Sequence, residues 1–485
     1  MTPFWTAVIF VLLALFLWRW SRPKNFPPGP WPVPGLGNFL QVDFSNPLPE
    51  FKKLAKKYGN VFSIYMGNNL VVVLHGYHAL REALVNYGPL FADRPVDPML
   101  DRLLENRGIV GARYGQSWKE QRRFCLMLLK NFGLGKTSME TRIFEEAKHM
   151  VKYFKENEGH AFDPRPIISN TIGNIMSCIL FGRRFAYEEE TLHRILKQIS
   201  EISLTLCTFW GELYNAIPLI RGLPLPFQKA IKNMDIIKGF LHDIIEEHKR
   251  TFTPGDPRDF IDKYLEEIAM RQNDGSSFND ENLHTLMFDL LESGSNTQAS
   301  ATLWSLLLLM TYPDIQEKCY GEIHSVFDGK EEISYMDRAD MPYTTAFIHE
   351  VQRFAAIVPF GVSHCFTKEV SFLGYTISPN TRVVIDLSSA LWDESQWKFP
   401  NEFNPANFLN GDGEFVKPDA FLPFSAGPRM CLAENLSHME TFIIISTLLK
   451  HFEFFWPEKS TVPDLTRAFA IVHFPIPYKV GYKSR

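Results

Sequence analysis

Apolar residues recur every three or four positions along most of the chain, a spacing that predicts amphipathic helices. The longest such run covers 279–312, where Asn279 is suited to cap the first turn and Pro313 to end the helix. Apolar and polar residues alternate in two short stretches, 61–75 and 370–387, and this alternation predicts β-strands.

Each alternating stretch also contains a turn signal. Gly-Asn-Asn lies at 67–69 and Ser-Pro-Asn at 378–380, so we predict that both stretches are β-hairpins. The chain shows no internal repeat and no low-complexity segment. We therefore expect residues 46–485 to form a single, mainly α domain with small β-sheets.

The N-terminal run is apolar throughout. Residues 1–18 contain no charged side chain, and as a helix they would span roughly 27 Å, at the short end for a membrane span. Arg19, Arg22 and Lys24 follow, and basic residues favour the cytosolic side. We expect a signal-anchor transmembrane helix over 1–20 with the remaining chain in the cytosol; a cleaved signal peptide is the alternative.

Prolines dominate the segment after the expected anchor. The sequence Phe-Pro-Pro-Gly-Pro-Trp-Pro-Val-Pro-Gly at 26–35 cannot form a helix or a paired strand, because proline lacks the backbone N–H. We expect 21–45 to be a stiff hinge and linker between the anchor and the following domain.

Composition excludes several classes of function. The 485 residues are 45% hydrophobic and include 41 Phe, enough for a large core. The net charge of −5 argues against nucleic-acid binding. Six cysteines occur without a C-x-x-C pair, so neither a zinc cluster nor a disulfide scaffold is indicated, and the thiols suit a reducing compartment.

The strongest chemical signal is the spacing Phe-x-x-Gly-x-Arg-x-Cys at 424–431. Phe424 can pack beside a metal ligand, Gly427 permits a turn with positive φ, and Arg429 can pair with a carboxylate. Cys431 precedes a predicted helix, whose dipole would stabilise a thiolate able to bind haem iron. A lone cysteine is more often a buried, inert thiol, so this interpretation depends on the whole group.

Two further pairs of residues have suggestive spacing. Trp118 and Arg122 share a helix face and could hold an anion, although an indole packed on an arginine stem is an equally simple arrangement. Glu350 and Arg353 lie one turn apart and can pair, either at a surface or within a core.

The long helix is interrupted by a small, polar patch, Ser-Gly-Ser-Asn-Thr-Gln at 293–298. Such residues are costly inside a helix, and they are favourable where the groove faces a ligand. A helix crossing that needs small side chains is the alternative. The apolar, proline-broken segment 217–227 has a similar ambiguity, because it either packs in the core or contacts a membrane.

Together these motifs resemble the cytochrome P450 superfamily, in the expected order over the whole chain. The resemblance implies the P450 fold and haem b, iron protoporphyrin IX, with the Cys431 thiolate as axial ligand. It further implies that Glu350 and Arg353 are structural. The cofactor-binding residues that it implies are Cys431, Arg429, Phe424, Gly427, Trp118, Arg122, His364 and Arg94, of which Arg94, Trp118, Arg122, His364 and Arg429 would contact the propionates.

On the other face of the haem, the resemblance assigns catalysis to Thr297 and Asn296. Thr297 matches the threonine that positions water and hydrogen-bonds iron-bound oxygen, whereas Asn296 replaces the usual proton-relaying acid. Asn407 and Ala433 also depart from the family pattern, by losing a charge and adding a methyl group. The implied substrate pocket is formed by Val110, Ala112, Ser293, Gly294, Val358, Val362, Ile471 and Val472.

The wording of several segments is most similar to vertebrate microsomal family 2 enzymes. This implies a monooxygenase of the endoplasmic reticulum membrane that hydroxylates or epoxidises lipophilic fatty acids, steroids or xenobiotics. Its electrons would come from NADPH through NADPH–cytochrome P450 reductase, with cytochrome b5 as a second candidate partner. The candidate reductase surface is the basic set Lys119, Arg123, Lys130 and Lys136, which could equally be a solvated helix face.

Two alternatives remain open at this point. A haem-thiolate peroxide isomerase would need no reductase, and the missing acid at Asn296 favours it, while Thr297 argues against it. A weakly active haem-binding protein is suggested by the combined departures at 296, 407 and 433.

Overall fold

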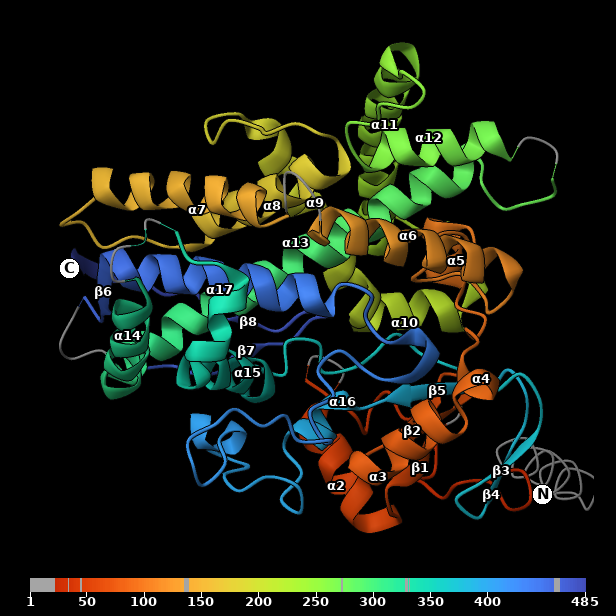
Figure 1. The fold of residues 1–485 in the computed structure, drawn as a ribbon. Helices are drawn as coiled ribbons and strands as arrows, with labels where there is room; N and C mark the ends of the chain where they lie inside the picture. The colour runs from red at the N-terminus through yellow and green to blue at the C-terminus, as the bar shows by residue number, and fades with distance from the viewer. Residues whose placement is uncertain are drawn as a thin grey trace, which may run out of the picture.

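Helix α13 (Asp280–Thr311) runs through the centre of the molecule (Figure 1). The Asn279 side chain accepts a hydrogen bond from the Asn282 backbone N–H (2.9 Å), and the next helix starts at Pro313. The predicted ends of this helix are therefore confirmed. Most of its side chains are buried, including Trp304, because helices from both halves of the chain pack around it.

The computed structural model describes residues 22–33, 35–43, 46–134, 139–271, 274–327, 330, 332–457 and 463–485. Within them the predicted mainly helical domain with small sheets is confirmed. The other helices are α2 (Leu48–Tyr58), α3 (Tyr77–Arg81), α4 (Gly88–Phe91), α5 (Pro98–Leu104), α6 (Gln116–Leu134), α7 (Met139–Glu156), α8 (Arg165–Leu180), α9 (Glu190–Cys207), α10 (Phe209–Ala216), α11 (Phe227–Thr251), α12 (Phe260–Met270), α14 (Pro313–Phe327), α15 (Pro342–Ala355), α16 (Leu387–Leu391) and α17 (Glu434–His451). The strands are β1 (Val61–Met66), β2 (Asn69–Leu74), β3 (Val370–Phe372), β4 (Tyr375–Ile377), β5 (Arg382–Ile385), β6 (Phe452–Phe455), β7 (Arg467–Ala468), β8 (Phe474–Pro475) and β9 (Gly481–Ser484).

Most of the long helices lie in a different part of the molecule from the main sheet (Figure 1). Helices α8, α11, α15 and α17 pack against α13 and enclose the largest hydrophobic core. The three-stranded sheet β1-β2-β5 contributes to two smaller cores, one shared with α3 and the other with α2. The cysteine loop joins these two parts, since it leads from the sheet side into α17.

The first predicted hairpin is confirmed. Strands β1 and β2 pair antiparallel from Val61 opposite Leu74 to Met66 opposite Asn69, and Gly67 turns with φ 58°. The described part of the predicted hinge lies along β1. There the Ser63 N–H donates to the Pro28 carbonyl (2.7 Å), which fixes the proline segment to the sheet.

The second hairpin turns at a different place from the prediction, which was wrong on this point. Strands β3 and β4 are joined by Leu373 and Gly374, whose φ values of 47° and 86° match a tight two-residue turn. Asn380, also at positive φ, ends the hairpin segment, and β5 then pairs parallel with β2. The turn at 378–380 therefore connects the β3-β4 hairpin with strand β5 of the three-stranded sheet.

No helix among the described residues is long and apolar enough to cross a membrane. The anchor predicted over 1–20 lies outside the described residues.

Candidate active site

The cysteine loop is held in a sharp turn beside the start of α17. A short 3-10 turn, η5 (Gly427–Arg429), precedes Cys431, whose N–H donates to the Phe424 carbonyl (3.0 Å). Gly427 has φ +71°, and a Cβ there would lie 1.9 Å from the Leu84 carbonyl oxygen. The loop therefore requires glycine at this position and leaves the Cys431 thiol exposed.

Two opposing effects act on the Cys431 thiol. The surrounding protein partly desolvates the thiol although its surface stays accessible, and with the Glu434 carboxylate this raises its pKa; the Ala433 backbone N–H and the Arg122 guanidinium favour the thiolate. Because a metal ligand must be deprotonated, binding iron would displace the thiol proton. Ala433, one of the three residues that depart from the family pattern, is the N-cap of α17 and contributes its backbone N–H.

Gly427→Ala is expected to destabilise the loop by roughly 2–4 kcal/mol, because the new methyl group meets backbone and the left-handed φ is strained. The measurement is haem content per chain together with the thermal midpoint. Gly411→Ala is the matched control, since no atom lies within 4 Å of its added Cβ. Equal haem content in both variants would contradict this role of Gly427.

Three arginines converge beside the cysteine loop. Arg429 donates to the carbonyls of Ala92 (2.8 Å), Ile109 (3.1 Å) and Ala112 (2.7 Å). Arg94 donates to the carbonyls of Val110 (2.9 Å), Val362 (2.9 Å) and Ser363 (3.0 Å), and Arg122 donates to the Met430 carbonyl. Within the part of the chain that the structure describes, none of the three forms an ion pair with a carboxylate.

Three clustered arginines favour an anionic ligand, because Asp93 and Asp289 influence Arg94 only from beyond ion-pair distance within the described residues. Burial, reinforced by the neighbouring Arg94, lowers the pKa of Arg429 to about 8, and burial lowers the pKa of Arg94 to about 10. Removing like charges from water is costly unless an anion compensates them. The donor set therefore fits a dianionic group such as the two propionates of a haem.

The aromatic residues predicted to join this cluster use their N–H groups elsewhere. Trp118 Nε1 donates to the Ile109 carbonyl (3.2 Å), and the Arg429 and Arg122 guanidinium groups lie 4.2 and 5.5 Å from its ring centre. His364 Nδ1 lies 2.7 Å from the Phe91 carbonyl, and burial lowers its pKa well below the usual value. Both side chains therefore border the arginines as uncharged groups.

Glu350 and Arg353 form a fully buried ion pair, so the surface alternative is wrong. Two contacts of 2.7 Å join them, and Arg353 also donates to four backbone carbonyls between Leu391 and Glu402. Asn407 Nδ2 lies 3.2 and 3.3 Å from the two Glu350 oxygens. The uncharged Asn407 therefore keeps the hydrogen bonds of this cluster.

The residues of the polar patch on α13 contact different neighbours. Thr297 donates to the Ser293 carbonyl (2.5 Å), and Asn296 Oδ1 accepts from Ser200 of α9 (3.0 Å). Gly294 faces α8, where an added Cβ would lie 2.5 Å from Met176 Sδ. This placement favours the helix-crossing explanation for the glycine.

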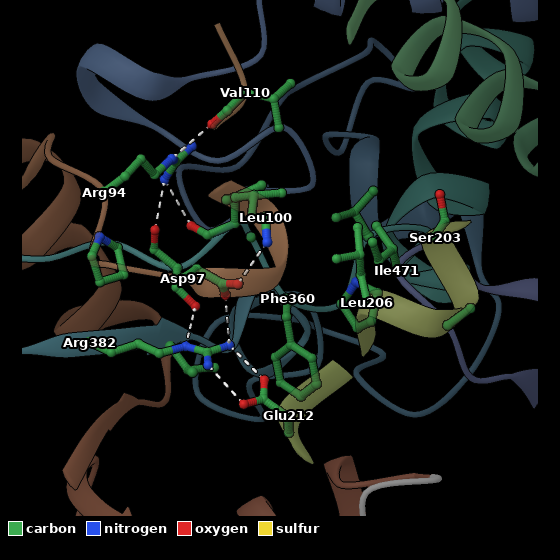
Figure 2. A pocket seen from close by; sticks show the side chains of 18 of the residues that line it. Arg94, Asp97, Leu100, Val110, Ser203, Leu206, Glu212, Phe360, Arg382 and Ile471 are labelled. Carbon is green, nitrogen blue, oxygen red and sulfur yellow. Dashed lines mark hydrogen bonds and ion pairs between the residues drawn. The ribbon is translucent and has the colours of Figure 1, made fainter. Parts of the chain in front are cut away.

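A cavity of about 230 Å³ adjoins the arginine cluster (Figure 2). Of the predicted pocket residues, Val110, Val358, Val362 and Ile471 line it. Ala112 and Val472 are buried in the core instead, and Ser293 and Gly294 lie on α13 outside this wall.

Several polar residues of the cavity wall were not predicted. They are Asp97, Ser203, Glu212, Asp289, Glu292 and Arg382. Arg382 and Glu212 form a bidentate pair (2.9 and 2.8 Å; Figure 2), which neutralises both charges.

Asp289 accepts from the N–H groups of Ile109 (2.7 Å) and Val110 (3.0 Å), and burial raises its pKa to about 7. Asp289 and Glu292 lie on an otherwise apolar stretch of the long helix, and this pattern was the sequence signal that could have identified them.

Three features together are those of a haem-thiolate enzyme. They are a cysteine at a helix start, arginines without a carboxylate ion pair among the described residues, and an adjoining, mainly apolar cavity. Residues 27–482 match the family model described as "Cytochrome P450". The chain is 41% identical to human cytochrome P450 2J2, covering 92% of this chain and 89% of the relative. It is 39% identical to mouse cytochrome P450 2D26 (99% and 98% covered) and 40% identical to human cytochrome P450 2D6 (97% and 96% covered).

The chain belongs to the cytochrome P450 family. It is a P450 monooxygenase that acts on lipophilic substrates, and its cofactor is a haem with a cysteine thiolate ligand. When bound, the haem supplies the iron centre at which molecular oxygen is activated.

Proposed function

We propose that this P450 inserts one oxygen atom from O2 into a fatty acid, steroid or xenobiotic by hydroxylation or epoxidation. The cavity beside the arginine cluster supports this proposal. Val110 connects the two features, because its side chain lines the cavity and its carbonyl accepts from Arg94. A substrate in the cavity would thus lie beside the proposed propionate site, against the apolar side chains of Val358, Val362 and Ile471.

Each residue of the candidate site would have a separate role in binding the haem or in catalysis. Cys431 would ligate the iron, and Gly427 would hold the loop that presents it. Arg94, Arg122 and Arg429 would bind the propionates, with Trp118 and His364 packed beside them. Thr297 would hold a proton or water on the substrate side through its hydroxyl, while Glu350 and Arg353 would hold the core beneath the loop.

We also propose that the enzyme works at the endoplasmic reticulum membrane, with residues 1–20 as anchor, 21–45 as hinge and 46–485 facing the cytosol. Leu219 and Leu223, in the segment after α10, are 93% and 49% exposed, which suits contact with lipid. Leu40 in the hinge is 73% exposed.

NADPH–cytochrome P450 reductase would deliver the electrons, and cytochrome b5 is a second candidate partner. Lys119 and Arg123, with Arg122, border a shallow surface pocket that also includes Pro428 of the cysteine loop. A basic surface next to the thiolate loop suits an acidic electron donor. The side chains of Lys130 and Lys136, the other two predicted members, lie outside the described residues.

The test is turnover of the full chain in lipid vesicles with the reductase, NADPH and isotopically labelled O2. We expect a fatty acid, steroid or aromatic substrate to gain one labelled oxygen atom, and to gain none when the reductase is omitted. Rearrangement of a lipid hydroperoxide without NADPH, and no product from O2, would instead establish the peroxide isomerase.

A further inference from the structure

The reaction proposed above needs protons on the substrate side of the haem. Reduction of O2 with insertion of one oxygen atom consumes two electrons and two protons and releases one water. A positioned acid usually supplies such protons. Asn296 cannot ionise, and its Oδ1 is already occupied by the Ser200 hydroxyl (3.0 Å).

The cavity wall offers four carboxyl groups, and three of them are engaged. Glu212 pairs with Arg382, which also has Asp97 within 4.0 Å. Asp97 itself caps α5 by accepting from the Leu100 N–H, and Asp289 holds the backbone N–H groups of the loop at 109–110. These contacts hold each of the three carboxyl groups in a fixed position.

Glu292 is the fourth carboxyl group. Among the described residues it accepts one hydrogen bond, from the Ser203 hydroxyl (3.0 Å), and it interacts electrostatically with Asp289. Within the described part of the chain no cation lies at ion-pair distance from it. Burial raises its pKa, so the group tends to retain a proton. Figure 2 shows Ser203, the partner of Glu292, on the opposite side of the cavity from Arg94 and Arg382.

Glu292 and Asn296 form one strip between α13 and α9. They lie one helical turn apart on α13, and their partners Ser203 and Ser200 lie three residues apart on α9. Water in such a polar strip can connect groups that do not touch directly. Such water would connect the Glu292 carboxyl group with Asn296, which precedes Thr297 in the chain.

We propose that Glu292, in place of Asn296, is the ionisable side chain that supplies protons to the substrate side of the haem. This proposal rests on the monooxygenase function proposed above. In each delivery the carboxylic acid of Glu292 gives its proton to water of the strip and becomes a carboxylate. It then regains a proton from solvent water that reaches the cavity, so Glu292 is unchanged after turnover.

Glu292→Gln tests the proposal, because the amide keeps the shape and the contact with Ser203 and cannot deliver a proton. With NADPH, reductase and O2, we expect product per NADPH to fall by roughly tenfold or more, with hydrogen peroxide released instead. With hydrogen peroxide as oxygen donor, which brings its own protons and reducing equivalents, product formation should stay within about twofold. Glu281→Gln, an exposed carboxyl on the same helix, is the matched control and should match wild type in both assays.

An infrared difference spectrum supplies a readout that does not depend on turnover. Resting wild type minus Glu292→Gln should show the C=O band of a protonated carboxylic acid at neutral pH. Ser203→Ala should shift that band through loss of one hydrogen bond, which keeps the test valid if the first variant folds poorly.

Three outcomes would overturn the assignment: no protonated band, unchanged coupling in Glu292→Gln, or equal losses in the O2 and peroxide assays. Equal losses would mean that Glu292 acts on substrate binding or packing. Failure of the wild type to insert oxygen into a fatty acid, steroid or xenobiotic would instead reject the proposed function, and the infrared band would still report on Glu292.

Discussion

Replacing Cys431 with serine is expected to reduce O2- and NADPH-dependent product to below about 1% of wild type, because a hydroxyl oxygen cannot supply the electron donation of a thiolate. The Arg94, Arg122 and Arg429 cluster remains in this variant, so it should still retain part of its haem. Turnover and haem content of the same preparation provide the measurement.

Cys319→Ser is the control for loss of a thiol at a site away from the cysteine loop. Cys319 is buried in α14 and burial raises its pKa, so it is an inert thiol. We expect this variant to keep haem and turnover. A Cys431→Ser enzyme that retains wild-type turnover would show that another group ligates the iron.

Glu350→Gln is expected to lower the free energy of unfolding by roughly 3–5 kcal/mol, because it leaves the Arg353 charge buried without its partner. Asn407 offers no replacement charge, because its side chain is an uncharged amide. That amide donates to Glu350 and accepts from the Phe399 N–H. Urea unfolding followed by tryptophan fluorescence measures the change.

The matched control for this variant is Glu156→Gln, which breaks the exposed pair with Lys152. That contact is 3.8 Å long, with side chains 61% and 71% exposed, so the change should stay within about 0.5 kcal/mol. Equal effects of the two substitutions would contradict the structural role of the buried pair.

Local signals predicted the main elements of the fold. Asn279 and Pro313 mark the ends of α13 because capping and helix breaking depend on the residues themselves. Gly67 likewise marks the first hairpin. The signal at 378–380 is also a local turn, but sequence could not show that β5 leaves its neighbours to pair with β2, since that choice depends on tertiary packing.

The candidate site was predicted unevenly for a related reason. The cysteine loop is a contiguous motif, so spacing alone brought Gly427, Arg429 and Cys431 together. Asp289 and Glu292 were missed because their meaning depends on α9 and on the loop at 109–110, which meet them only in the folded chain. Spacing also could not decide whether the small residue at 294 faces a ligand or a helix.

The family pattern has a proton-relaying acid at position 296, where this chain has an amide. The amide at Asn296 lies beside α9, and the ionisable group of the strip is one turn earlier at Glu292. If both proposals hold, the loss of the acid at 296 does not imply a weakly active protein.

The central claim is that Cys431 binds haem iron as a thiolate in this P450. The spectrum of the purified, reduced chain with carbon monoxide tests it most directly. We predict the strongly red-shifted Soret band of a thiolate-ligated haem in wild type, and its loss in Cys431→Ser. A wild-type Soret band at the position of a histidine-ligated or ligand-free haem would contradict the account.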